Sequence, residues 1–122
     1  MDKIVSYKDL QIWKNGINLV GEIYNLTRGM PKEEMFGLVS QMRRAAVSVP
    51  SNIAEGFARQ SFREYIQFLS IAVSSCAELD TQLVIALQQK YISDIQYQTI
   101  STNLEIEVKM TKSLINKIRS KD

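Results

Sequence analysis

The stretch QMRRAAVSVPSNIAEG, Gln41–Gly56, carries no charged residue between Arg44 and Glu55 and places Pro50 near its middle. A surface helix normally has a polar face opposite an apolar stripe of about 100°, and an interior proline removes a helical hydrogen bond. We therefore expect a helix that is covered on more than one side, with Pro50 accommodated as a packing bend. The alternative is that the bend exposes carbonyl groups near Ala46 to a partner.

Start and stop signals around this stretch divide the chain into four helices. Ser6, Ser61 and Ser93 are suited to helix N-caps, while Gly29 and Pro31 end the first helix. The expected helices cover residues 7–28, 32–58, 61–89 and 94–119. Connections of a few residues force neighbouring helices to run antiparallel. The sequence thus predicts an all-α fold, an antiparallel up-down-up-down four-helix bundle, as a single domain over residues 1–122.

Composition agrees with one globular domain. The chain has 122 residues, 45% of them apolar, which is enough to build one core. A single cysteine excludes an internal disulfide and fits a reducing compartment. The N-terminal residues have no signal-peptide pattern. We expect a cytoplasmic protein with no membrane association.

Three of the four helices have more uncharged surface than a monomeric bundle covers. In the opening stretch, small side chains at Ala45, Ser48 and Asn52 lie away from the apolar side that contains Met42 and Ile53. Small residues allow another helix to approach closely. We therefore expect a homo-oligomer in which helices pack between subunits. The alternative is a monomer with scattered exposed apolar residues, which is common.

Charged residues on the apolar faces indicate a structural ion pair. Arg43 lies on the apolar arc of its helix and Asp80 on the central stripe of the next helix. A hairpin turn near residue 60 places Arg43 level with Glu78 and Asp80. Buried charges need partners, so we expect Arg43 to pair with Glu78 and Asp80 in a partly buried network.

Exposed cations form the candidate binding residues. The C-terminal part of the last helix has five basic residues between Lys109 and Lys121 and no acidic one. Aligned cations of this kind can bind nucleic-acid phosphates whatever the base sequence. The simpler explanation is a basic face that contacts only solvent, because the net charge of the chain is only +2. The candidate nucleic-acid-binding residues are Arg44, Arg59, Arg63, Lys109, Lys112 and Arg119.

The sequence lacks the usual elements of a catalytic site. Histidine is absent, so there is no imidazole base or common set of transition-metal ligands. Cys76 lies on an apolar stripe and is expected to be an inert core thiol. There is no glycine-rich phosphate loop. We expect no catalytic residue, no metal, no cofactor and no enzyme activity.

Three segments resemble a known family: YKDLQIWKNGINLVGEIYNLT, FGLVSQMRRAAVSVPSNIAEGFARQS and EYIQFLSIAVSSCAELDTQL. They are similar to the bacterial four-helix-bundle family named for the 23S rRNA intervening-sequence protein. The most specific part is the block from Arg43 to Gly56, with Arg59, Ser61 and Glu64 also fitting. The basic end of the last helix carries no family signature.

The resemblance implies more than the residues do. Similar proteins include the accessory variability determinant of diversity-generating retroelements, a pentamer that associates with a reverse transcriptase and binds nucleic acid. It implies a homopentamer of unknown function that binds structured RNA or DNA, with a reverse transcriptase or other nucleic-acid enzyme as a partner. The alternative is a protein-interaction scaffold with no nucleic-acid role, which would show an exposed apolar or mixed groove.

Overall fold

A computed structural model describes residues 4–121, so residues 1–3 and 122 of the expected single domain lie outside the described residues. Four α-helices dominate it. Two short 3-10 helices, η1 and η2, precede the first and second of them. The elements are η1 Tyr7–Asp9, α1 Gln11–Arg28, η2 Lys32–Glu34, α2 Leu38–Phe57, α3 Phe62–Gln88 and α4 Asp94–Ser120. The described chain is therefore all-α with four main helices, as expected.

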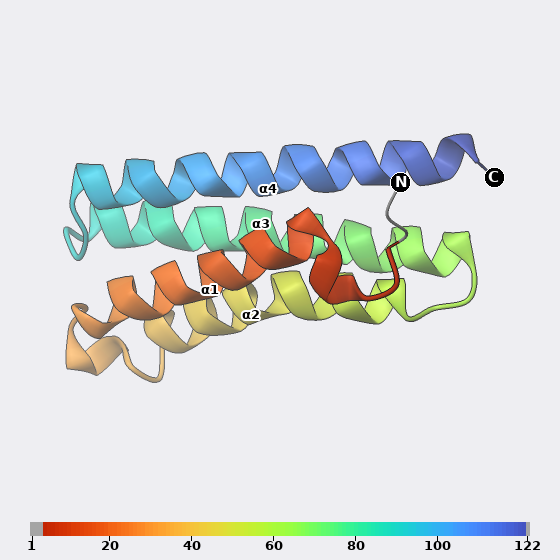
Figure 1. Cartoon of the computed structure of the whole chain (residues 1–122). Helices are drawn as coiled ribbons and strands as arrows, with labels where there is room; N and C mark the ends of the chain where they lie inside the picture. The colour runs from red at the N-terminus through yellow and green to blue at the C-terminus, as the bar shows by residue number, and fades with distance from the viewer. Residues whose placement is uncertain (1–3, 122) are drawn as a thin grey trace.

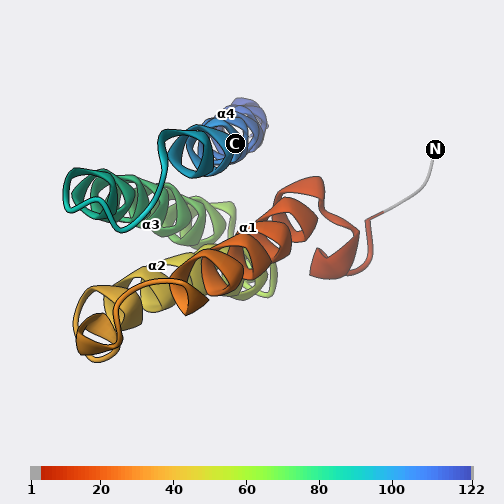
Figure 2. The ribbon, with the colours of Figure 1, turned by 90° about the vertical axis from the view of Figure 1, so that its left-hand side faces the viewer.

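The helices lie side by side, and the chain reverses direction at each connection (Figure 1). α2 packs against α1 and α3, and α4 packs against α3 and α1. The α2–α3 contact is the most extensive and the α1–α4 contact the least. Turned by 90°, Figure 2 shows α2 and α4 on opposite sides of the bundle, separated by α1 and α3.

The expected caps are present, but two helices start later than expected. The side chains of Ser6, Ser61 and Ser93 each accept a hydrogen bond from a backbone N–H at the start of their element. The first segment breaks at Leu10, whose backbone is extended, so α1 begins at Gln11 rather than Tyr7. The second breaks before Leu38, because Gly37 has a backbone conformation that does not continue a helix.

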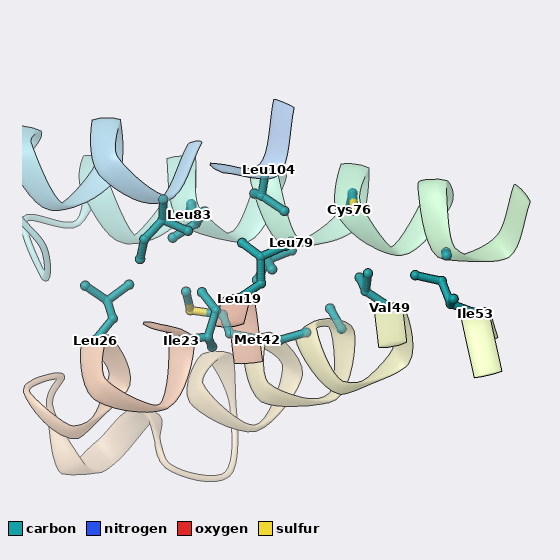
Figure 3. Packing of buried hydrophobic residues seen from close by; sticks show 14 of the residues in the cluster. Leu19, Ile23, Leu26, Met42, Val49, Ile53, Cys76, Leu79, Leu83 and Leu104 are labelled. Carbon is teal, nitrogen blue, oxygen red and sulfur yellow. The ribbon is translucent and has the colours of Figure 1, made fainter. Parts of the chain in front are cut away.

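The core lies between all four helices. Leu19 and Ile23 of α1, Met42 of α2 and Leu79 of α3 are completely buried, and they point toward one another in Figure 3. Each apolar side chain removed from water contributes roughly 1.5–3 kcal/mol to folding. Packing of these side chains, rather than the helices' intrinsic preference, therefore holds the bundle together.

Pro50 is accommodated where α1 has no side chain. α2 continues through Pro50 from Leu38 to Phe57, and Pro50 is buried. A Cβ atom placed on Gly16 of α1 would lie only 3.3 Å from the Pro50 Cβ. The proline ring therefore packs against the bare backbone of Gly16, which supports the interpretation of Pro50 as a packing feature.

The small residues of the opening stretch face α3 of the same chain. Ala45 is buried, and the hydroxyls of Ser48 and Ser75 are hydrogen-bonded at 2.8 Å. The Asn52 amide donates to the carbonyl and the hydroxyl of Ser48, each at 2.8 Å. We expected these positions to admit a helix of another subunit. Instead the intramolecular α3 occupies that side, and the stretch is poor in charge because α2 lies between α1 and α3.

α3 is long and apolar enough, by length and composition, to cross a membrane. A helix in the core of a bundle passes the same test, and so this property is weak evidence for a span. Leu69, Leu79 and Leu83 of α3 are completely buried against the other helices. Packing within the bundle thus accounts for part of the apolar composition of α3, while Ile71 and Ile85 stay exposed.

Candidate functional site

The six candidate cations are all exposed, but they fall in three places. Arg44 lies in the first half of α2, Arg59 and Arg63 flank the α2–α3 connection, and the other three lie on α4. Arg44 and Arg59 are separated by fifteen positions, and on a helix this spacing corresponds to about 22 Å. Arg44, Arg59 and Arg63 therefore do not form one continuous basic patch on one copy of the chain.

The largest group of cations lies along one face of α4. A shallow depression there is lined by Lys109, Lys112 and Lys117, together with serines and an asparagine. These polar side chains, Ser113, Asn116 and Ser120, lie at helical spacing between the lysines. The sequence-based set included Lys109 and Lys112 but omitted Lys117. Arg119 does not line this depression, although it follows Lys112 by seven positions and so lies on the same side of α4.

A second group lies at one end of the bundle. The α2–α3 connection and the C-terminal end of α4 are at the same end in Figure 1, so Arg59, Arg63 and Arg119 belong to that end. The Arg59 guanidinium lies 4.7 Å from the centre of the Phe68 ring, a cation–π contact. Glu64 is also exposed there and caps α3 through Ser61. This end therefore carries more positive than negative side chains.

Arg43 contacts α1 rather than α3. Its Nε donates a hydrogen bond to the Thr27 hydroxyl at 2.9 Å, and its guanidinium lies 4.5 Å from the centre of the Tyr24 ring. We expected Arg43 to pair with Glu78 and Asp80. That prediction was wrong, because the face of α2 that carries Arg43 packs against α1. The partners of the guanidinium are neutral groups, the Thr27 hydroxyl and the Tyr24 ring.

The two acidic residues of the expected network have other surroundings. Glu78 is exposed and accepts a hydrogen bond from Gln82 of its own helix at 3.4 Å. Asp80 lines a groove between α3 and α4 together with Lys109 and Lys112. The three members of the expected ion network therefore point to three different places.

Sequence reasoning missed the most unusual polar group of the bundle, Glu107 of α4. This side chain is completely buried. Its Oε1 accepts a hydrogen bond from the Asn15 amide at 3.0 Å, whereas its Oε2 has no hydrogen-bond partner within residues 4–121. A Cβ atom on Gly16 would lie 3.4 Å from that Oε2. Residues of α1 and α4 thus enclose one unsatisfied carboxyl oxygen.

Burial changes the acid–base properties of this region. Loss of water raises the pKa of Glu107 from its ordinary 4.5 to about 7, while the hydrogen bond from Asn15 lowers it in part. The pKa of the Cys76 thiol is raised to about 12 by burial and by the negative charge of Glu107. Cys76 is therefore protonated and buried, which agrees with an inert core thiol.

The burial of Glu107 could have been predicted from the spacing of the core residues of α4. Its buried residues are Ile100, Leu104, Glu107, Thr111, Ile115 and Ile118. They recur every three or four positions, as core residues of a helix do. Glu107 and Thr111 occupy two of these core positions, and the Thr111 hydroxyl is satisfied by the Glu107 carbonyl at 2.7 Å.

Within residues 4–121, no group of three or more His, Cys, Asp or Glu side chains is arranged to hold a metal ion. The titratable groups with the largest pKa shifts, Glu107 and Cys76, are buried. The solvent-facing features include a set of cations on α4 and at one end of the bundle, and a groove beside α2.

Comparison with known proteins identifies the relatives of this chain. Residues 8–113 match the model of the 23S rRNA-intervening sequence protein family. A crystal structure of a protein with unknown function from the S23 ribosomal protein family of Bacteroides thetaiotaomicron is similar, with 25% identity and a TM-score of 0.80. The similarity covers 85% of this chain and 97% of that one. No curated protein matches the chain. The chain therefore belongs to the 23S rRNA-intervening sequence protein family.

Proposed function

We propose that this antiparallel up-down-up-down bundle is a non-enzymatic, homo-oligomeric protein that binds structured RNA or DNA. The observation that carries the proposal is the α4 face with Lys109, Lys112 and Lys117. Lysine is a flexible point charge suited to phosphate, and the serine and asparagine side chains between the lysines add hydrogen-bond donors. Such contacts bind the backbone and do not read sequence.

Arg59, Arg63 and Arg119 extend this proposed interface to the end of the bundle. Long phosphate backbones contact cations on several elements, so a second group near the α4 face increases the number of contacts. Arg44 lies on α2, on the opposite side of the bundle (Figure 2). It is therefore left out of the interface of a single copy.

Oligomerisation is supported by apolar side chains that the monomer leaves exposed. Phe36 is 97% exposed, and Ile71 and Ile85 of α3 are about half exposed. The number five and the association with a reverse transcriptase come only from the family resemblance. A ring of copies would repeat the α4 face and so bind nucleic acid with greater avidity than one copy.

The test is binding of a fluorescent RNA hairpin and a DNA duplex over a range of salt concentrations. Lys109→Gln, Lys112→Gln and Lys117→Gln together should weaken binding at least tenfold. For the duplex, they should reduce the slope of log K against log salt by about 0.9 for each lost phosphate contact. A control with Lys14→Gln, Lys32→Gln and Lys90→Gln has the same net charge, and these lysines are also exposed.

Equal binding by the two triple variants would contradict the α4 interface. Absence of wild-type binding at low salt would contradict the nucleic-acid function altogether. The second candidate, a protein-interaction scaffold, would then be favoured by the groove beside α2 that contains the exposed Phe36.

A further inference from the structure

Phe62 of α3 is a large aromatic side chain that the fold leaves in contact with solvent. It is 47% exposed, and it is the first residue of α3, directly after the N-cap Ser61. Leu69, which follows it on α3 by about two helical turns, is completely buried. Because this spacing returns to the same side of a helix, Phe62 lies on the core side of α3. The exposed ring thus continues that side beyond the core itself.

The ring is uncovered because α1 is shorter than the helices beside it. α1 has 18 residues and α3 has 27. α1 begins at Gln11, after the extended backbone of Leu10, and in Figure 1 it starts short of the end at which α2 connects to α3. The first turn of α3 therefore projects past α1, which explains why an apolar residue on its core side is half exposed.

Three exposed arginines lie at the same end of the bundle as this ring. Arg59 lies in the α2–α3 connection just before the ring, and Arg63 directly follows the ring on α3. Arg119 lies at this end on α4 (Figure 1). Arg59 contacts the neutral ring of Phe68, so this contact does not cancel its charge. Glu64 is exposed there too, but its carboxylate is hydrogen-bonded to the hydroxyl that caps α3. The exposed ring is therefore accompanied by a net positive charge.

An aromatic ring beside cations distinguishes unpaired from paired nucleic acid. The bases of a duplex are covered by their neighbours in the stack, whereas an unpaired base offers its face to an aromatic side chain. Such stacking tolerates any base, because every base has a π face, and cations bind the adjoining phosphates. The depression on α4 has no aromatic side chain in its lining, so its lysines recognise phosphates of single and double strands alike.

We propose that Phe62 stacks on an unpaired base of a nucleic-acid strand whose phosphates contact Arg59 and Arg63. The inference rests on the proposed nucleic-acid binding and goes beyond it by naming the class of ligand, a single-stranded segment such as the loop of a hairpin. Arg119 and Lys109 are ten positions apart on α4, which corresponds to about 15 Å. One hairpin therefore spans both groups of cations, with its loop at the end of the bundle and its stem along α4.

The experiment compares the affinities of two fluorescent ligands, a short oligouridylate and an RNA duplex of the same length. Phe62→Ala should weaken binding of the single strand about tenfold, the effect of losing one stacked base, and change binding of the duplex less than about twofold. Phe62→Leu keeps an apolar side chain without a π face and should weaken the single strand to a similar extent. Phe62→Trp offers a larger ring and should bind the single strand at least as tightly as the wild type.

The control is Ile95→Ala, which removes an exposed apolar side chain at the opposite end of the bundle (Figure 1) and should change neither affinity. Circular dichroism of each variant verifies that the helices persist. Undiminished binding of the single strand by Phe62→Ala or Phe62→Leu would overturn the stacking and leave the proposed function standing. Equal losses for both ligands would overturn it too, since they would mean that Phe62 supports the assembly and not a base. A wild type that binds neither ligand at low salt would overturn the proposed function and this inference together.

Discussion

The polar side chains of α2 and α4 differ in whether they have hydrogen-bond partners. In α2, Arg43, Ser48 and Asn52 each have hydrogen-bond partners, on α1, on α3 or within α2. In α4, Glu107 is more deeply buried than any of these, yet one of its oxygens has no partner within residues 4–121. These polar side chains of α2, a helix with few charges, thus have hydrogen-bond partners. α4 has more charged residues, and it buries a carboxyl group of which one oxygen has no partner within residues 4–121.

This difference separates two kinds of contribution to stability. A satisfied polar contact adds about 1 kcal/mol and varies little with conditions. A buried carboxyl group without full pairing makes stability depend on its protonation state. We therefore expect α2 to determine how the helices fit together, and α4 to determine how the stability of the bundle responds to pH.

The largest expected effect is the loss of stability when Glu107 ionises. Burial raises its pKa from 4.5 to about 7 in the folded chain, so the folded state holds the proton more tightly than the unfolded state. The stabilisation is complete below pH 4.5 and declines as the pH rises through about 7. The total decline is about 3 kcal/mol. Urea unfolding at pH 5 and pH 8 measures it.

Glu107→Gln isolates this effect from other titrating groups. The glutamine has a similar shape, can accept from Asn15 and does not ionise. The difference in unfolding free energy between wild type and variant should therefore change by about 2.5 kcal/mol between pH 5 and pH 8, in favour of the variant at pH 8. Parallel stability curves for the two proteins would show that Glu107 does not titrate in the folded state as expected.

The second effect concerns the close packing of α2 on α3. A Cβ atom on Gly56 would lie 2.8 Å from the Phe68 Cβ and 3.2 Å from the backbone oxygen of Tyr65. Neither atom belongs to a flexible side-chain end, so Gly56→Ala must separate the two helices. We expect a loss of about 2 kcal/mol in thermal or chemical unfolding.

Gly21→Ala is the matched control in α1. A Cβ atom there meets no other atom within 4 Å. Alanine restricts the unfolded chain and favours the helix, so Gly21→Ala should stabilise the protein by about 0.5–1 kcal/mol. Effects of the same sign at Gly56 and Gly21 would argue against the close α2–α3 contact.

The sequence predicted the number and approximate bounds of the helices because their caps and apolar periodicity are local. It did not predict which way Arg43 points. A rotation of α2 about its axis by a fraction of a turn decides whether Arg43 faces α1 or α3, and the sequence does not fix this rotation.

The turn between α3 and α4 has no glycine to mark it in the sequence. Lys90 adopts the left-handed conformation there, with φ 63°. Its N–H and that of Tyr91 bond to the last turn of α3.

Glu107 escaped prediction for a different reason. A glutamate between Ile106 and Val108 is normally assigned to a solvated face. Its core position follows only when the spacing from Leu104 to Ile118 is given more weight than residue type. The candidate cations could be chosen from the sequence because exposed charges need no tertiary contact. Their separation into an α4 face, a group at one end of the bundle and Arg44 on α2 required the fold.

The smallest effect tests whether Arg43 belongs to the satisfied network of α2. Arg43→Ala removes the hydrogen bond to Thr27 and the contact with the Tyr24 ring. Combined with Thr27→Val in a double-mutant cycle, it should reveal a coupling of about 1 kcal/mol in the free energy of unfolding.

The matched cycle pairs Arg43→Ala with Glu78→Gln, the partner that helix periodicity had suggested. Because Arg43 faces α1 and Glu78 is exposed on α3, this coupling should stay below about 0.3 kcal/mol, the level at which distant sites are additive. Both cycles are best measured at protein concentrations low enough to avoid the proposed oligomerisation. A stronger coupling to Glu78 than to Thr27 would reverse the assignment, because it would mean that Arg43 is satisfied by a charge and not by the neutral groups of α1.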